Sequence, residues 1–461
     1  MHPLPQDAAH GRTKTPHAVV IPLEFQGHVI PAVHLALRLA ARGFAVTFVN
    51  TESVHQQMAR AHSIDPQQYD IFAGAHGADV RYEIVSDFPS AEQEQDVPPA
   101  HMEELLRRVI LHPASTCLIA DTFFEWPATM ARRLGVPYVS LWTEAALVFA
   151  LYYHMDLLMK HGHYNCKEPR KDSITYIPGV TEIEPHELMS YLQETDTTSV
   201  MHRIIFKAFQ DVRSADYILC NTVEELEPST IAALRAVKPF YAVGPIFLDR
   251  SSYNTVATSM WAESDCSDWL DAQPAGSVLY ISFGSNAQIT TRELHEIAGG
   301  VLASGSRFLW VMHSHMVSSE DQDPLPHGFI AAAAGRGLVV PWCCQAEVLS
   351  HAAVGGFLTH CGWNSVLESM WAGVPMLCFP LLTDQLTNRR LVAREWRVGL
   401  SIGAQEVGAR IQGVISGKEG LELRQAVTKV RETLKAAVAP GGSSQRSFDE
   451  FVHQLTRHCG G

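Results

Sequence analysis

The sequence predicts an α/β protein in which two parallel sheets face each other across a cleft. Short apolar segments typical of buried strands alternate with helical segments from residue 17 onward, as in a parallel sheet covered by helices. The alternation pauses and starts again near residue 277, so the chain contains two similar α/β halves. A length of 461 residues allows two large domains. Because parallel sheets bind ligands at the carboxyl ends of their strands, two facing sheets predict a binding cleft between the halves.

The first half begins with a strand–loop–helix–strand unit, the usual start of a parallel sheet. We expect a strand at 17–21, a loop at 23–28, a helix over 30–39 that ends at Gly43, and a strand at 44–49. Further apolar runs, each followed by a helical segment, predict strands at 117–121, 138–142 and 216–220.

The second half repeats this pattern. We expect strands at 277–283, 308–312, 337–341, 355–360 and 375–379, with a helix over 292–302. The expected domain organisation is a first domain over 1–247, a linker over 248–267 that has little periodicity, a second domain over 268–440, and a last helix within 441–461.

Composition narrows the classes of protein. The chain carries 35 Lys and Arg against 49 Asp and Glu, a net charge of −14, and such a surface disfavours nucleic acid as a partner. The longest apolar stretches are well short of the ~20 residues that cross a bilayer, and no apolar segment follows a basic start as in a signal peptide. Nine cysteines without a CxxC pair indicate reduced thiols. We therefore expect a cytoplasmic protein that spans no membrane.

The segment 342–385 gathers residue types that suit a nucleotide sugar. Residues 359–365 (THCGWNS) follow an apolar strand and precede a helix expected at 366–371, and a helix N-terminus binds anions. Asn364 and Ser365 are capping residue types, and His360 adds a donor, so together they can hold a diphosphate without a metal. Glu368, expected on the first helical turn, can accept two ribose hydroxyls.

The ends of this segment supply the remaining contacts. Trp342 can stack on a base. Asp384 and Gln385, a carboxylate and an amide, can bind sugar hydroxyls at the start of a helix expected over 384–394.

The same segment strongly resembles the signature box of plant family 1 UDP-dependent glycosyltransferases. It has the length of that box and its W–Q–HCGWNS–E–DQ skeleton without a gap. The resemblance extends to QGHVIP (26–31), CLIAD (117–121), LWTEAA (141–146), CNTVEELE (220–227) and the tail GSSQRSFDEFV (442–452). It implies two Rossmann-like domains facing across a cleft, the GT-B architecture, with the last helix returning to the first domain.

The resemblance also implies roles for the site residues. Trp342 stacks on uracil, the backbone of Cys343 pairs with uracil, and Gln345 and Glu368 bind ribose. The diphosphate is held by His360, Asn364, Ser365 and Ser285, and the sugar is contacted by Trp363, Asp384, Gln385 and Thr143. A terminal Gln in the box is the family's usual mark for glucose.

The first domain is expected to supply the chemistry. Glycosyl transfer to a hydroxyl needs a base that removes the acceptor proton, and His28 in the loop after the first strand has a suitable pKa range. Asp121, at the end of another strand, can bind the other ring nitrogen and fix the tautomer. A single displacement opposite UDP would invert the anomeric carbon from α to β.

The predicted function is therefore metal-independent, inverting transfer of glucose from UDP-glucose to a hydroxyl of a small lipophilic acceptor, by a monomer that needs no cofactor. Asp321-Gln322-Asp323 is a metal-binding DxD pattern in other glycosyltransferases, but here it lies in an acidic loop that follows no strand. The first strand lacks the GxGxxG of a dehydrogenase. The stretches 87–100 and 402–410 look shorter than in relatives, which leaves a catalytically weak UDP-sugar or small-molecule binding protein as the alternative.

Overall fold

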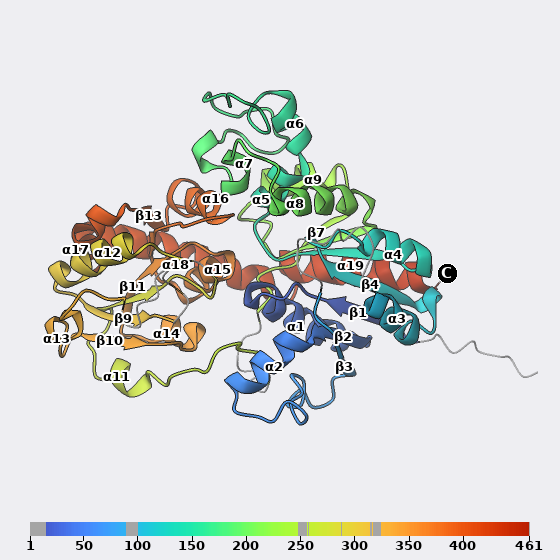
Figure 1. Cartoon of the computed structure of the whole chain (residues 1–461), viewed down its shortest axis with the longest axis horizontal. Coiled ribbons are helices and arrows are strands. Elements are labelled where there is room, and N and C mark those ends of the chain that lie inside the picture. The colour runs from blue at the N-terminus through green and yellow to red at the C-terminus, as the bar shows by residue number, and fades with distance from the viewer. Residues whose placement is uncertain are drawn as a thin grey trace, which may run out of the picture.

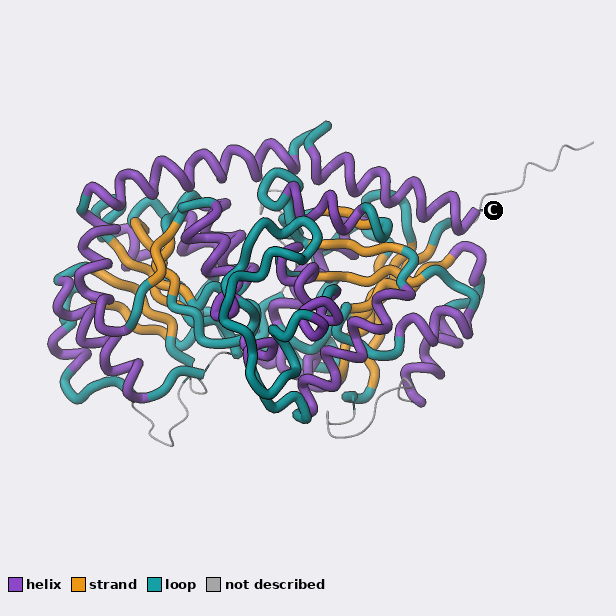
Figure 2. Tube along the Cα trace, turned by 90° about the horizontal axis from the view of Figure 1, so that it is seen from above, coloured by secondary structure: helices purple, strands orange, loops and turns teal. Residues whose placement is uncertain are grey.

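The computed structural model describes residues 15–88, 100–247, 256, 258–286, 288–313, 316 and 324–460. Within them the chain forms two parallel sheets that lie side by side, each covered by helices (Figures 1 and 2). The expected α/β class with two parallel sheets is confirmed. Of the expected linker, only 256 and 258–267 are described, and most of the stretch 87–100 and the DxD at 321–323 lie outside the described residues.

The first sheet has seven described strands in the order β3-β2-β1-β4-β5-β6-β7, and every pair is parallel. Its strands are β1 (His17–Ile21), β2 (Ala45–Thr51), β3 (Val80–Val85), β4 (Thr116–Asp121), β5 (Tyr138–Trp142), β6 (Tyr217–Cys220) and β7 (Phe240–Ala242). The change of direction in strand order lies between β1 and β4, which is where open α/β sheets bind ligands.

The second sheet has six described strands in the order β10-β9-β8-β11-β12-β13, again all parallel. Its strands are β8 (Val278–Ser282), β9 (Arg307–Val311), β10 (Gly337–Val340), β11 (Val354–Thr359), β12 (Met376–Cys378) and β13 (Gly399–Ser401). Its switch point lies between β8 and β11, so the two sheets repeat one topology.

Helices connect successive strands. In the first domain they are α1 (Gln26–Ala40), α2 (Glu52–Ala61), α3 (Ala100–Val109), α4 (Pro127–Leu134), α5 (Ala146–Tyr153), α6 (Met155–Lys160), α7 (Ser190–Gln193), α8 (Val200–Asp211) and α9 (Pro228–Arg235). In the second they are α11 (Ser267–Asp271), α12 (Thr291–Ser304), α13 (Phe329–Ala332), α14 (Gln345–Ser350), α15 (Trp363–Ala372), α16 (Gln385–Arg390), α17 (Val407–Ser416) and α18 (Lys418–Val438), followed by α19 (Ser443–Gly460).

Alternate residues of each strand enter different apolar clusters because strand side chains point to opposite faces. In β1, Val20 packs in the cluster that contains residues of α1 and α19, whereas Val19 packs with residues of α3, α5 and α8. The second of these clusters continues without interruption into the second domain, where it includes Tyr280 and Trp363. The two domains are therefore joined by apolar packing as well as by the chain.

The starts of two helices differ from the expectation. The helix after β1 begins at Gln26 instead of near residue 30, so His28 lies in its first turn and not in a loop. The helix after β11 begins at Trp363 instead of Val366, so Asn364 and Ser365 are helical residues and Glu368 lies on the second turn. Both first turns face the cavity between the domains, so their residues lack the apolar period from which a helix start is inferred.

The last helix lies across the first domain. Figures 1 and 2 show α18 and α19 end to end along one side of the molecule, α18 over the second sheet and α19 over the first. Phe448 and Phe451 of α19 are fully buried in the first domain's apolar cluster. In the described part of the chain, no helix combines the length and the apolar character that a membrane crossing needs.

Candidate functional site

A cavity of about 980 Å³ opens between the two domains. In the first domain its walls are the start of α1 and the segments after β4 and β5; in the second they are the segments after β8, β10, β11 and β12. All of these lie at the carboxyl ends of parallel strands, where such sheets bind ligands. We call this cavity the cleft.

Most of the predicted site residues meet in the cleft. Thirteen of the fourteen line it: His28, Thr143, Ser285, Trp342, Cys343, Gln345, His360, Trp363, Asn364, Ser365, Glu368, Asp384 and Gln385. The fourteenth, Asp121, is 1% exposed and lies behind His28.

His28 is held by two residues at the ends of neighbouring strands. Its Nδ1 lies 2.7 Å from Asp121 Oδ2, at the end of β4, and 3.1 Å from Thr143 Oγ1, just after β5. Because both contacts use Nδ1, Nε2 is the ring nitrogen left for a substrate. Burial lowers the pKa of His28, but the Asp121 carboxylate and, to a lesser extent, Asp384 outweigh burial, so that this pKa is raised overall. Such a pair can accept a proton at Nε2 and stabilise the resulting imidazolium.

The start of α15 presents free backbone donors to the cleft. The N-cap is Gly362, which has no side chain that could cap the helix. The first helical bond runs from Val366 N–H to Gly362 O. The N–H groups of residues 363–365 therefore have no acceptor within the helix. Such a terminus suits a diphosphate.

His360 is fixed beside this helix start by two glycines. A Cβ on Gly284 or on Gly362 would come within 2.5 or 2.4 Å of His360 Nε2, so any other residue at either position would displace the ring. Burial lowers the pKa of His360 to about 4, which keeps the imidazole neutral at pH 7. Ser285, next to Gly284, also lines the cleft.

A network of hydrogen bonds orders the side chains on the side of the cleft where ribose is expected to bind. Gln345 Nε2 donates to Glu368 Oε2 at 2.8 Å and to Ser365 Oγ at 2.9 Å, while Tyr280 Oη donates to Gln345 Oε1 at 3.3 Å. Burial raises the pKa of Glu368 to about 7. Trp342 stands on the same side, tilted against Trp261 with ring centres 5.9 Å apart. A carboxyl group and an indole placed in this way can bind a diol and a flat base.

Asp384 and Gln385 are both fixed before any ligand binds. Thr383 Oγ1 donates to Asp384 Oδ1 at 2.8 Å, and Asn388 Nδ2 donates to Oδ2 at 2.6 Å. Gln385 Oε1 accepts from the N–H groups of Leu381 and Leu382 at 2.9 and 3.1 Å. Because the amide oxygen of Gln385 is occupied, its amide nitrogen is the group left to donate to a ligand.

Two box residues also contact the first domain. Asn364 Nδ2 donates to Gly27 O at 2.9 Å, and the Trp363 indole N–H donates to Asn221 O at 2.7 Å. The Trp363 indole N–H is thus occupied by the domain interface and is not available to a sugar. Asn221 was not predicted as a site residue, although it lies in the CNTVEELE segment directly after the strand expected at 216–220.

Sequence reasoning also missed Glu144. It lines the cleft beside Thr143, and its Oε2 is enclosed without a hydrogen-bond partner in the described residues. Burial, with Asp384 and Asp121 nearby, raises the pKa of Glu144 well above its ordinary value. Its position directly after the strand expected at 138–142 is the signal that would have identified it.

The part of the chain that the structure describes contains no group of three or more His, Cys, Asp or Glu side chains that could hold a metal ion. His163, which follows α6, takes part in a local contact, with its Nδ1 2.8 Å from Tyr176 Oη.

Comparison with known proteins identifies the family. The family model described as UDP-glucoronosyl and UDP-glucosyl transferase matches residues 17–410. UDP-glycosyltransferase 86A1 of Arabidopsis thaliana is 48% identical to this chain over 471 aligned residues, which cover 96% of this chain and 95% of the relative.

Two solved structures share the fold. Phytolacca americana UGT2, complexed with UDP-2fluoro-glucose and pterostilbene, has a TM-score of 0.77 at 27% identity and matches over 96% of this chain and 100% of its own. A UDP-glucosyltransferase from Polygonum tinctorium capable of glucosylating indoxyl has a TM-score of 0.78 at 28% identity, over 96% of this chain and 99% of its own. These matches confirm the two facing Rossmann-like domains of GT-B. The chain belongs to the plant family 1 UDP-glycosyltransferases, enzymes that transfer a sugar from a UDP-sugar to an acceptor.

Proposed function

We propose that this enzyme transfers glucose from UDP-glucose to a hydroxyl group of a small lipophilic acceptor, with inversion at the anomeric carbon and without a metal ion. The observation that carries the proposal is the His28–Asp121 pair, 2.7 Å apart, in the same cleft as the residues of the box. The base and the expected donor site belong to different domains, so acceptor and donor meet between them.

The proposed reaction has one displacement step. His28 Nε2 removes the acceptor's hydroxyl proton while the oxygen attacks C1 of the hexose, and UDP leaves from the opposite face. Asp121 keeps the proton of the neutral ring on Nδ1 and stabilises the imidazolium that forms. The backbone donors at the start of α15, with neutral His360, balance the charge that develops on the leaving diphosphate.

The acceptor side of the cleft supports a lipophilic substrate. The part of the cleft wall that the first domain forms is rich in aromatic and aliphatic side chains, from Phe88, Phe123, Phe124, Tyr152, Tyr191, Met201, Ile204 and Ile205. The ring centres of Phe123 and His28 lie 6.0 Å apart, which places an apolar wall beside the base. Two solved structures with this fold are complexes with aromatic molecules, pterostilbene in one and 3,4-dichloroaniline in the other.

Turnover with an acceptor library tests this proposal. The purified protein is incubated with UDP-glucose, UDP-galactose or UDP-glucuronate and a panel of phenols and other lipophilic alcohols, with UDP release and glycoside masses measured. We expect UDP-glucose to give the highest kcat/KM and EDTA to leave the rate unchanged. Equal rates with glucose and galactose would contradict the donor assignment. Binding of UDP-glucose without UDP release on any acceptor would favour the weak binding protein.

The proposal includes a monomer that works in the cytoplasm. Size-exclusion chromatography with light scattering at assay concentration should give one chain of 50.9 kDa. A stable dimer that loses activity on dilution would contradict the monomer.

A further inference from the structure

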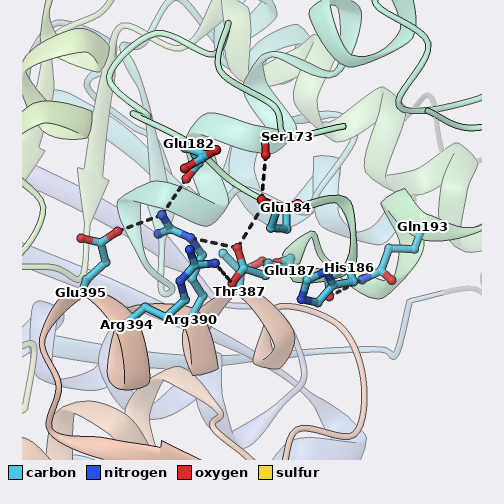
Figure 3. Close-up of polar contacts among 10 residues, drawn as sticks. All are labelled: Ser173, Glu182, Glu184, His186, Glu187, Gln193, Thr387, Arg390, Arg394 and Glu395. Atoms are coloured by element: carbon cyan, nitrogen blue, oxygen red, sulfur yellow. Dashed lines mark hydrogen bonds and ion pairs between the residues drawn. The ribbon is translucent and has the colours of Figure 1, made fainter. Parts of the chain in front are cut away.

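One segment of the first domain contacts residues of the second domain that lie before and after Asp384 and Gln385 in the chain. The segment lies between β5 and β6 and includes a short 3₁₀ turn, Pro185–Glu187, and α7. Its partners are Thr383, just before the two sugar-contact candidates, and the side chains of α16 and of the turn Leu391–Glu395 that follows. Figure 3 shows Thr387, Arg390 and Arg394 around Glu187.

Glu187 is the centre of the contact after Gln385. Its carboxylate is 5% exposed; Oε1 accepts from Arg394 Nη1 at 2.6 Å, and Oε2 forms an ion pair with Arg390 Nε at 3.1 Å. Thr387 Oγ1 donates to the Glu187 carbonyl oxygen at 2.7 Å. Thr387 and Arg390 belong to α16 and Arg394 to the turn that follows, so a single residue of the first domain contacts both elements.

Arg390 extends the same contact. Its Nη2 donates to the backbone oxygen of Glu182 at 2.6 Å and lies 2.8 Å from Glu395. The Arg390 side chain is 8% exposed, so its charge is stabilised mainly by these partners.

Ser190 makes the contact before Asp384. Thr383 N–H donates to Ser190 Oγ at 2.9 Å, and Ser190 N–H donates to Thr383 O at 3.2 Å. Thr383 has φ of +54°, a left-handed conformation that a β-branched residue rarely adopts. Such a conformation persists only where surrounding contacts fix it, and here both backbone partners come from the other domain.

We propose that Glu187 and Ser190 are positioning residues for the donor sugar: by fixing Thr383 and α16 they place Asp384 and Gln385 against the hexose. This inference rests on the proposed function, in which those two residues bind the sugar. Neither Glu187 nor Ser190 lines the cleft, so both act through the segment that they hold. The position of the residues proposed to bind the hexose thus depends on both domains. The residues expected to bind uridine, Trp342, Gln345 and Glu368, all belong to the second domain.

This division predicts that the variants change the affinity for UDP-glucose but not the affinity for UDP. In Glu187→Gln and Ser190→Ala, affinity for UDP should stay within about twofold of wild type. Affinity for UDP-glucose should fall roughly tenfold, with a higher KM for UDP-glucose, a lower kcat and little change in the KM of the acceptor. Glu187→Asp, which keeps the charge, should recover part of the loss.

Glu182→Gln is the matched control. It makes the same change of charge in the same segment, but the Glu182 side chain is exposed and only its backbone oxygen contacts Arg390. Calorimetry with UDP and with UDP-glucose, steady-state kinetics and melting temperatures are measured for all four variants. If Glu187→Gln folds poorly, Ser190→Ala tests the proposal alone, because it removes only one hydroxyl group.

The outcomes are distinguishable. The positioning role would be overturned if Glu187→Gln and Ser190→Ala showed wild-type binding and kinetics, or if they lost affinity equally for UDP and UDP-glucose. If the wild type itself binds UDP-glucose no better than UDP and transfers no glucose, the proposed function fails, whatever the variants show.

Discussion

The proposed base and its carboxylate partner, His28 and Asp121, lie 93 positions apart in the chain. His28 follows β1 and Asp121 ends β4, and these strands are neighbours in the first sheet. The carboxyl ends of these strands therefore bring the two side chains within hydrogen-bond distance. Thr143, after the next strand along the sheet, completes the contacts of Nδ1.

Replacement of His28 should separate chemistry from donor binding. We expect His28→Ala to lower kcat roughly 10²–10⁴-fold, the usual cost of losing a general base, while UDP affinity stays nearly constant. Calorimetry and turnover assays measure the two quantities. Unchanged turnover would remove His28 from the mechanism.

The pH profile tests the role of Asp121. Because the pKa of His28 is raised above 6.5, the fraction of neutral base should fall as the pH drops through that raised value, so kcat/KM should show an acid limb above pH 6.5. Asp121→Asn should lower kcat and move the limb to lower pH, since the carboxylate that favours the imidazolium is gone. An acid limb at the same pH in both proteins would contradict this coupling.

Glu368 should make nucleotide binding depend on pH. Its pKa of about 7 in the free protein means that the group is largely protonated below pH 7. Ribose hydroxyls donate to the carboxylate form, so binding releases a proton and UDP affinity should fall as the pH drops below about 7. Glu368→Gln should bind UDP more weakly and lose this part of the pH dependence. The titration of UDP itself affects the wild type and the variant equally. The difference between their two pH profiles of UDP affinity therefore reports on Glu368.

The two helices whose first turns line the cleft begin at residues that show no amphipathic pattern. The first turns of α1 and α15 face the cleft, so their side chains were selected for polar contacts, and both helices start several residues earlier than periodicity indicates. Strand β3 was not predicted for a related reason. It is the edge strand of the first sheet and is largely half-exposed, so it lacks the apolar run of β4 or β5.

The turn after β8 should tolerate no side chain at Gly284. That residue has φ of +76°, and an added Cβ would lie 2.5 Å from the buried His360 ring. We expect Gly284→Ala to destabilise the fold by about 1–3 kcal/mol and to weaken UDP binding, because His360 must move away from the start of α15. Thermal unfolding and UDP calorimetry measure both effects.

Gly305 provides the matched control for this change. It ends α12 with φ of +66°, but a Cβ there would meet nothing within 4 Å. Gly305→Ala should therefore lose stability from backbone strain alone and bind UDP normally. Equal UDP affinities in the two variants would contradict the proposed role of the His360 packing.

Across the whole molecule, the chain ends by returning to the domain in which it began. After the second domain, α19 packs against the first sheet, where Phe448 is fully buried and Arg38 of α1 lies 4.2 Å from the centre of its ring. Arg42 and Asp449 add an exposed ion pair at 2.6 Å, which contributes little by itself. Apolar burial is therefore the main force that holds α19 in place.

Phe448→Ala should destabilise the first domain by about 3–5 kcal/mol, the usual cost of removing a buried Phe. Because the donor site is far from this contact in the chain and belongs to the other domain, UDP affinity below the melting transition should be unchanged. Phe206→Ala, at a Phe of α8 that is 40% exposed, is the control and should have a small effect. Equal melting temperatures for the two variants would show that α19 contributes little to the first domain.

The sequence by itself determined the alternation of strands and helices in the two halves and the set of residues proposed for the donor site. Apolar runs fix strands through local burial, and the box residues are contiguous or follow strand ends, so parallel topology brings them to one edge. Tertiary structure alone decided which side chains of one domain contact the other, such as Glu187 with Arg394, Ser190 with Thr383, and Asn221 with Trp363. Such contacts join positions more than 100 residues apart and leave no periodic signal, because they exist only once both domains have folded and docked.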